Sequence, residues 1–306
     1  MAKEEATLGE ILSASFNELK EKWKTFLGII ILLSFIPAII SFVVQIFWIK
    51  KFYGLGLNPN FSEIIAQFMT PQFYLLVVVG IIAFIIGILM QSSLIYNSLS
   101  KKKLMGVGES IAGGMKYFWK MFGLIILLAI IFSIPVSIII GIVVFIGLNA
   151  STLNLTLILV ATLFLFLIVV LYVIFAIYLM IKWIFSMYIL IGENKGVVES
   201  FRMSSSLVKK RWWKTLAYLL ILGLIIWGIQ LLFLIPALII NMIISVLAFG
   251  SLDLASLNDL SNGLTNYALI SMCVSFIFSL VSQIIITPLS VLYLKNQYLV
   301  WKGVKK

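Results

Sequence analysis

Residues 155–181 of this 306-residue chain, LTLILVATLFLFLIVVLYVIFAIYLMI, contain no charged side chain. Residues 73–89 form a second run of this kind. A run of 18 or more mainly apolar residues is typical of a transmembrane helix. Hydrophobic residues make up 63% of the chain and its mean hydropathy is +1.19, whereas soluble domains are about 45–50% apolar. The sequence therefore predicts an all-α integral membrane protein.

Six apolar segments are long enough to cross a bilayer, at about residues 26–49, 73–99, 121–148, 155–181, 215–247 and 267–294. Of the 22 Lys and Arg, all but Lys50 and Lys51 fall in the two termini and in the loops 100–120 and 182–214. Basic residues concentrate on the cytoplasmic side of membrane proteins. We therefore expect six spans with both termini in the cytoplasm, in a multi-pass protein of the plasma membrane.

The stretch 199–214, ESFRMSSSLVKKRWWK, has the pattern of a basic amphipathic helix on a membrane surface. Its predicted apolar face consists of Val198, Phe201, Ser205, Val208 and Trp212. Two similar segments lie near residues 8–24, where Thr7 and Glu10 form a capping-box pattern, and at 106–120. The predicted apolar face of the segment at 106–120 consists of Val107, Ile111, Met115 and Phe118.

These three segments place basic side chains next to the spans, where we expect them to contact anionic lipid headgroups. The candidate headgroup contacts are Lys24, Lys120, Arg202, Lys209, Lys210, Arg211 and Lys214. The formal net charge of +11 has the same explanation, because cytoplasmic loops of membrane proteins are basic. The predicted partner is therefore the lipid bilayer and not a nucleic acid.

The surface segments belong to a threefold internal repeat. Trp-Lys pairs occur at residues 23–24, 119–120 and 213–214, spaced by 96 and 94 residues. Each pair follows an acidic residue (Glu10, Glu109, Glu199) and precedes a span that contains a proline (Pro37, Pro135, Pro236). Self-similarity at a fixed period indicates a repeat architecture. We expect one membrane domain, residues 1–306, with units 8–103, 106–192 and 193–302. Each unit is a cytoplasmic amphipathic helix followed by a two-span hairpin, so the repeats are parallel.

Two stretches carry a resemblance to a known family. The first has Glu193, Gly196, Glu199, Arg202, Ser204, Leu207, Trp212 and Trp213 at the matching positions, and the second is TPLSVLYLKNQYL at 287–299. They resemble the membrane domain of glycerophosphoryl diester phosphodiesterases and its archaeal and bacterial relatives. Ser200, Phe201 and Ser205 depart from that pattern. The resemblance implies a prokaryotic membrane domain without the catalytic phosphodiesterase part.

The composition offers little for catalysis. The chain has no histidine, its single cysteine, Cys273, lies in an apolar run, and none of the 11 acidic residues lies in the middle of a span. We therefore expect no enzyme activity, no catalytic residue, no metal and no cofactor. The polar residues within the spans include Gln45, Gln91, Gln230 and Gln283. They either form hydrogen bonds between helices or line a polar path among the three repeats.

Two functions follow from these patterns. The first is a non-enzymatic membrane scaffold, or a protein with a lipid- or envelope-associated role, whose surface helices lie on the inner leaflet. The alternative is a transporter or channel with a path along the pseudo-threefold axis.

Overall fold

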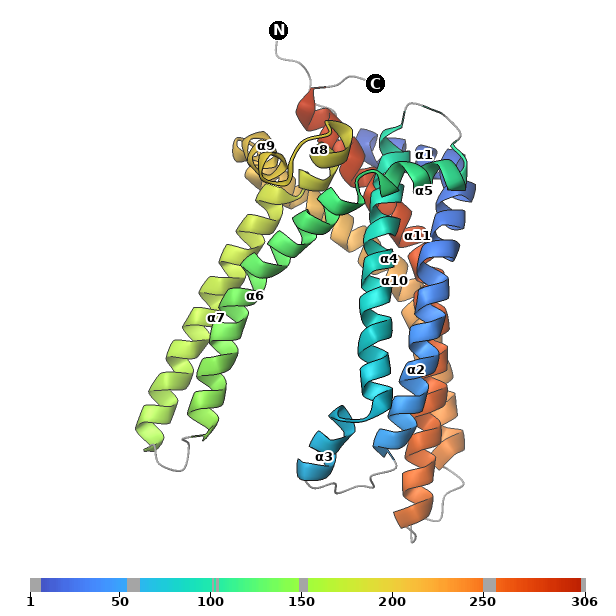
Figure 1. The fold of residues 1–306 in the computed structure, drawn as a ribbon, viewed down its shortest axis with the longest axis vertical. Coiled ribbons are helices and arrows are strands. Elements are labelled where there is room, and N and C mark those ends of the chain that lie inside the picture. Colours follow the sequence, from blue (N-terminus) through green and yellow to red (C-terminus); the bar gives the residue numbers. More distant parts are fainter. Residues whose placement is uncertain are drawn as a thin grey trace. The chain divides into compact units, whose positions relative to one another are not determined.

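Every regular element in the described part of the chain is a helix (Figure 1). The computed structural model describes residues 7–53, 61–100, 102, 105–148, 154–249 and 257–303. Six helical segments within these ranges are long and apolar enough to cross a membrane: Leu8–Ile49, Pro71–Leu99, Phe118–Phe145, Leu159–Gly192, Trp212–Leu247 and Asn266–Lys302. The prediction of six helices with the length and hydropathy of membrane spans is confirmed.

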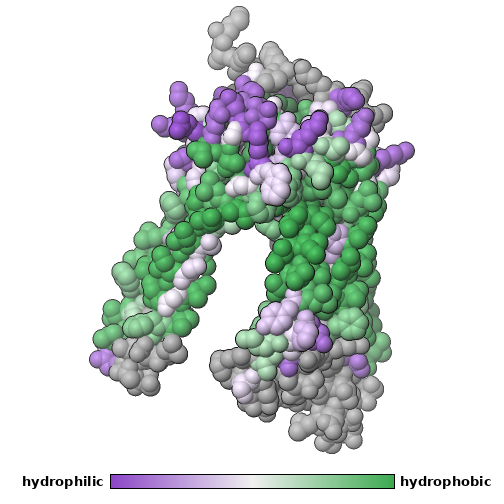
Figure 2. Space-filling view, viewed as in Figure 1, coloured by the Kyte–Doolittle hydropathy of each residue, from purple (hydrophilic) through white to green (hydrophobic). Residues whose placement is uncertain are grey.

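The chain divides into two compact units. Unit 1 consists of residues 1–115 and 219–296, and unit 2 consists of residues 116–218 and 297–306. Helices α10 (Trp212–Phe249) and α11 (Leu257–Lys302) begin in one unit and end in the other. Figure 2 shows that hydrophobic side chains cover the long helices of each unit, while hydrophilic ones gather near α5 in unit 1 and near α8 and α9 in unit 2.

Unit 1 begins with a surface helix that continues into the first span. Helix α1 (Leu8–Ile30) starts with the predicted capping box between Thr7 and Glu10. A π-helical segment, η1 (Ile31–Phe35), then connects it to α2 (Ile36–Tyr53). Pro37 explains this wider turn, because proline donates no hydrogen bond and its ring clashes with the carbonyl four residues earlier.

The other elements of unit 1 are α3 (Phe61–Phe68), α4 (Pro71–Leu99) and α5 (Val107–Met115). Helix α3 lies between the first and second spans. Helix α4 begins with Thr70 as its N-cap, followed by Pro71 at the first helical position, where a missing N–H costs nothing. Helix α4 packs against α2 and α5. Helix α11 joins α2 through the stacked rings of Phe42 and Phe276, whose centroids are 4.1 Å apart.

Unit 2 contains α6 (Phe118–Leu148), α7 (Leu155–Trp183), α8 (Ser186–Gly192) and α9 (Val197–Lys209). Helices α6 and α7 form a hairpin, and α9 packs against α6, α7 and α8. The sequence pattern predicts one amphipathic helix through residues 199–214, but the structure ends α9 at Lys209 and begins α10 at Trp212. A break at residues 184–185 separates α7 from α8.

Candidate functional site

The candidate site consists of three buried polar junctions at helix ends. One lies between α4 and α5, one between α11 and α1, and one between the α7–α8 break and α9. Each junction lies within a single unit. At each one, a completely buried serine of a surface segment bonds to the end of another helix.

In the first junction, Ser110 of α5 is 0% exposed and accepts a hydrogen bond from the Asn97 side-chain amide at 2.8 Å. The Ser110 hydroxyl in turn donates to the Gly106 carbonyl at 2.8 Å. Two glycines let α5 approach α4 this closely. A Cβ atom at Gly114 would lie 2.6 Å from backbone atoms of Ser93, and one at Gly113 would lie 1.9 Å from the Tyr96 ring. The face of α5 that packs on α4 therefore consists of Ser110, Gly113 and Gly114, and Met115 of the predicted apolar face is 64% exposed.

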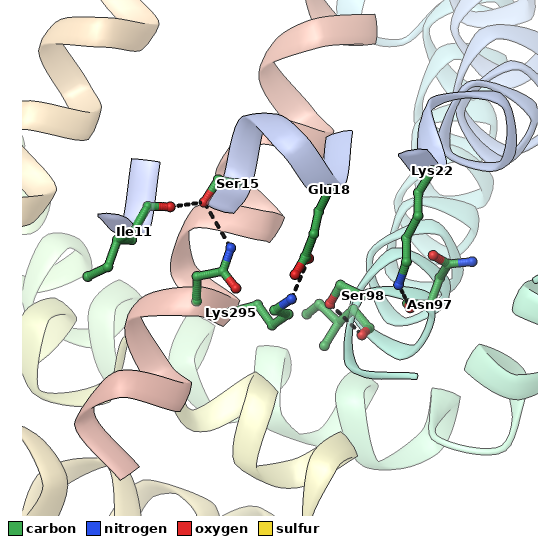
Figure 3. A network of polar contacts seen from close by, with 9 residues as sticks. Ile11, Ser15, Glu18, Lys22, Asn97, Ser98 and Lys295 are labelled. Atoms are coloured by element: carbon green, nitrogen blue, oxygen red, sulfur yellow. Dashed lines mark hydrogen bonds and ion pairs between the residues drawn. The ribbon is translucent and has the colours of Figure 1, made fainter. Parts of the chain in front are cut away.

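In the second junction, α1 is tied to α11 (Figure 3). Ser15 is 0% exposed, donates to the Ile11 carbonyl at 2.7 Å and accepts from the Asn296 amide at 3.0 Å. One turn further along α1, Glu18 forms an ion pair with Lys295, whose side chain is 4% exposed. A buried ion pair costs desolvation energy for both charges, so it adds little net stability. Its main effect is to specify that α1 and α11 pack together at this point.

In the third junction, Ser204 of α9 satisfies the backbone groups that the break between α7 and α8 leaves free. Its hydroxyl donates to the Lys182 carbonyl at 2.9 Å and accepts from the Phe185 N–H at 3.2 Å. A continuous helix would satisfy both groups internally. Ser200, one turn earlier and also 0% exposed, donates to the Gly196 carbonyl at 2.7 Å.

Ser204→Ala is expected to destabilise unit 2, because it leaves a buried carbonyl and a buried N–H without partners. The cost of such groups is about 1–3 kcal/mol. The measurement is the thermal unfolding midpoint of the purified chain in detergent. Ser206→Ala, on the exposed side of the same helix, is the matched control and is expected to leave the midpoint unchanged. Equal midpoints for the two variants would contradict this role of Ser204.

A second set of contacts joins basic side chains to the carbonyl ends of helices. Lys22 donates to the Asn97 carbonyl at 3.0 Å near the end of α4. Lys120 donates to the carbonyl and side-chain oxygens of Asn194, just after α8, at 3.3 and 2.8 Å. Arg211 donates to the Trp301 carbonyl near the end of α11 at 3.0 Å. Cations at a helix C-terminus satisfy free carbonyls and interact favourably with the helix dipole.

The end of α11 is held in unit 2 by aromatic and charged contacts. The Trp301 indole N–H donates to the Thr215 hydroxyl at 3.0 Å, and the Lys214 ammonium lies 5.4 Å from the centre of the Trp301 ring. Glu193 accepts a hydrogen bond from Tyr298 at 2.6 Å and pairs with Lys302 at 2.9 Å. Partial burial would raise the pKa of Glu193, but the bonds from Tyr298 and Lys302 and the nearby lysine charges outweigh it and lower that pKa.

The structure separates the seven predicted headgroup contacts into two groups. Lys120, Arg211 and Lys214 are turned toward other parts of unit 2 by the contacts above. The exposed side chains are Lys24, Arg202, Lys209 and Lys210. The predicted apolar face of α9 is only partly correct: Phe201 and Val208 are buried, whereas Val198 is 66% exposed. That face packs on the helices of unit 2.

The four glutamines of the predicted polar path all belong to unit 1. Gln283 of α11 accepts a hydrogen bond from Ser34 of the π-helical segment at 3.2 Å. Gln45 and Gln91 are half-buried, and Gln230 is exposed on α10. The Ser34–Gln283 contact joins two spans in the way that polar residues commonly join membrane helices.

The buried serines other than Ser204, together with Lys22, Glu18 and Lys295, are the residues that sequence reasoning missed. Ser15, Ser110 and Ser200 occupy inward positions of amphipathic helices, where hydrophobic spacing predicts large apolar residues. The small and hydroxyl-bearing residues themselves could have indicated these positions, because such residues are enriched where membrane helices approach closely. The spacing of hydrophobic residues does not identify these buried positions.

The fold and the junctions define the class of this molecule as a helical, multi-pass membrane protein with polar contacts between its surface helices and the ends of its spans. No protein-family model, no curated protein and no solved structure matches the chain.

Proposed function

We propose that the chain is a membrane scaffold, or a protein with a lipid- or envelope-associated role, without enzymatic activity. In this proposal it lies in the plasma membrane of a prokaryote with both termini in the cytoplasm. The observation that carries the proposal is the docking of the surface helices. Their inward faces are bonded to span ends, and this leaves Arg202, Lys209 and Lys210 exposed on the opposite side of α9 and at its end.

The proposal includes three parallel repeats, 8–103, 106–192 and 193–302. Recurring contacts support it. Near the start of the first span of each repeat, a cation bonds to a backbone carbonyl at or just beyond the end of the second span: Lys22 to Asn97, Lys120 to Asn194, two residues past the second repeat, and Arg211 to Trp301. The three cations occupy different positions relative to the Trp-Lys pair of their repeat, so the likeness is one of contact type and not of exact register.

A second recurring contact joins successive repeats. The surface helix of the second repeat bonds to the end of the first repeat through Ser110 and Asn97. That of the third bonds to the second through Ser204, and that of the first bonds to the third through Ser15 and Asn296. A contact of the same kind therefore links each surface helix to another repeat, which supports the repeat as a structural unit.

The resemblance to the glycerophosphoryl diester phosphodiesterase membrane domain remains part of this proposal. Ser204, one of the residues that carry the resemblance, bonds to both sides of the α7–α8 break. Glu193, another, binds Tyr298 and Lys302 in the second stretch of the motif and just after it. These contacts support a structural role for the shared residues and involve no hydrolytic chemistry.

Cysteine labelling tests the topology. In a Cys273→Ser background, Lys209→Cys tests the surface helix α9, and Met69→Cys, 65% exposed in the native chain, tests the loop before α4. We expect a membrane-impermeant maleimide to label Met69→Cys in intact spheroplasts and Lys209→Cys in inverted vesicles. Labelling of Lys209→Cys from outside the cell would refute the proposed topology and the inner-leaflet role together.

The alternative is a transporter or channel, and one observation favours it. The π-helical segment Ile31–Phe35 lies within the first span, and its Ser34 bonds to Gln283 of the last span. Single-turn π segments in membrane helices often occur at functional sites. Ion flux from proteoliposomes distinguishes the two functions: flux that Gln283→Leu abolishes would support the alternative, and no flux above empty liposomes supports the scaffold.

A further inference from the structure

The turn between α9 and α10 contains four basic residues, and the structure assigns them to different tasks. Arg211 donates to the Trp301 carbonyl, and Lys214 lies over the Trp301 and Tyr218 rings. Lys209 and Lys210 are exposed, and no residue of the described ranges bonds to either ammonium group. Two adjacent cations are therefore available at this turn to bind a ligand.

Trp213 places this turn at the membrane surface. It lies in the first turn of α10, a helix long and apolar enough to span, and it is 77% exposed. Exposed indoles at span ends concentrate at the level of the lipid headgroups, because one part of the ring is apolar and its N–H is polar. Lys210 precedes Trp213 by only three residues and lies in the turn that leads into α10.

Helix α9 presents its free charge on one side. Ser200, Phe201, Ser204 and Val208 form its buried face. Arg202, Ser206 and Lys209 lie on the opposite, exposed side, spaced by about one helical turn. The positive potential of Arg202 therefore adds to that of the two lysines.

We propose that Lys209, Lys210 and Trp213 form a binding site for the phosphate headgroup of an anionic glycerophospholipid. The inference rests on the proposed function, since it requires this turn to face the inner leaflet. The two ammonium groups bind the phosphate as point charges, and the indole is placed at the depth of the glycerol backbone. The neighbouring Trp213 favours a lipid over a soluble acidic protein, because an indole so exposed at a span end is in contact with bilayer.

The experiment measures phosphatidylglycerol binding to the full-length chain by native mass spectrometry, with phosphatidylcholine as the neutral reference lipid. The wild-type chain is expected to bind phosphatidylglycerol in preference. Lys209→Gln/Lys210→Gln is expected to weaken that binding by roughly tenfold, because each cation near an anionic lipid contributes to affinity. Trp213→Leu is expected to weaken the binding of both lipids.

Lys20→Gln/Lys116→Gln is the charge-matched control, since both lysines are exposed and lie outside the site. It is expected to change the affinity by less than about twofold. An equal loss in the control, or no preference for phosphatidylglycerol in the wild type, overturns the site. Competition by free inorganic phosphate at low millimolar concentration would also overturn it, in favour of a soluble ligand.

The two proposals fail separately. If Lys209→Cys is labelled from the cytoplasmic side but the lysine variants bind phosphatidylglycerol normally, the headgroup site is wrong and the topology stands. If Lys209→Cys is labelled from outside, both are wrong. An acidic soluble protein that binds the wild-type chain and not Lys209→Gln/Lys210→Gln, without any lipid preference, would reassign the surface.

Discussion

Gly114→Ala is expected to lower the thermal unfolding midpoint of the purified chain. A Cβ atom at this position would lie 2.5–2.6 Å from the Ser93 hydroxyl, Cα and backbone nitrogen. Backbone atoms inside a helix cannot move aside as a flexible side chain does, so α5 must move away from α4. Overpacking of this kind costs about 1–3 kcal/mol, and occasionally more. It also separates Ser110 from Asn97, which are 2.8 Å apart.

Gly108→Ala is the matched control, because it makes the same change in the same helix. A Cβ atom at Gly108 meets nothing within 4 Å. Alanine has a higher helix propensity than glycine, so this variant, in the first turn of α5, is expected to keep or slightly raise the midpoint. Scanning fluorimetry of both variants in detergent measures the difference. If Gly114→Ala were as stable as Gly108→Ala, the close packing of α5 on α4 would be wrong.

Glu18→Leu is expected to destabilise the junction between α1 and α11 strongly. Glu18 pairs with Lys295, whose side chain is only 4% exposed. Removing the carboxylate leaves a buried ammonium group without its counter-charge, which typically costs about 3–5 kcal/mol. The expected result is a large fall in the thermal midpoint and loss of protection of α1 in a proteolysis assay.

Two further variants separate lost pairing from lost packing. Glu18→Leu/Lys295→Met removes both charges and is expected to recover much of the stability, since apolar residues of similar size often replace a buried ion pair without loss. Glu21→Leu makes the same change at an exposed position of α1 and is expected to have a small effect. If the double variant were less stable than Glu18→Leu, the cost would not arise from an unpaired charge.

The sequence predicted the spans well because the signal is strong and local. A charge-free run such as residues 155–181 has one low-energy structure in a bilayer, a helix that satisfies its own backbone groups. The capping box of Thr7 and Glu10 was also predictable, since it involves residues only three positions apart. The π-helical segment Ile31–Phe35 lies just before Pro37, a residue type that disrupts the regular hydrogen bonding of a helix.

The buried faces of the surface helices were predicted less well, and the reason is physical. Hydrophobic spacing identifies a face that avoids water, but these helices bury small and hydroxyl-bearing residues such as Ser15 and Gly114. Their partners are 13 to 281 residues away in the chain. Whether a serine is buried against a helix end depends on that distant partner, which no local pattern contains.

The basic residues also show that local sequence does not determine which side chains form tertiary contacts. Lys210 and Arg211 are neighbours with similar side chains, yet Lys210 is exposed and Arg211 donates to the Trp301 carbonyl. Composition placed both at the cytoplasmic surface. Only the position of the end of α11 decides which of the two meets a free carbonyl.

The amino-acid sequence by itself thus determined the helical membrane class, the six spans and their approximate limits, because the cost of placing polar groups in a bilayer acts on each segment independently. The tertiary structure alone decided which serines, lysines and glycines form the junctions, since those contacts require two helices to meet. A hydrogen bond or ion pair forms only over about 3 Å, and sequence spacing does not specify that distance between separate helices.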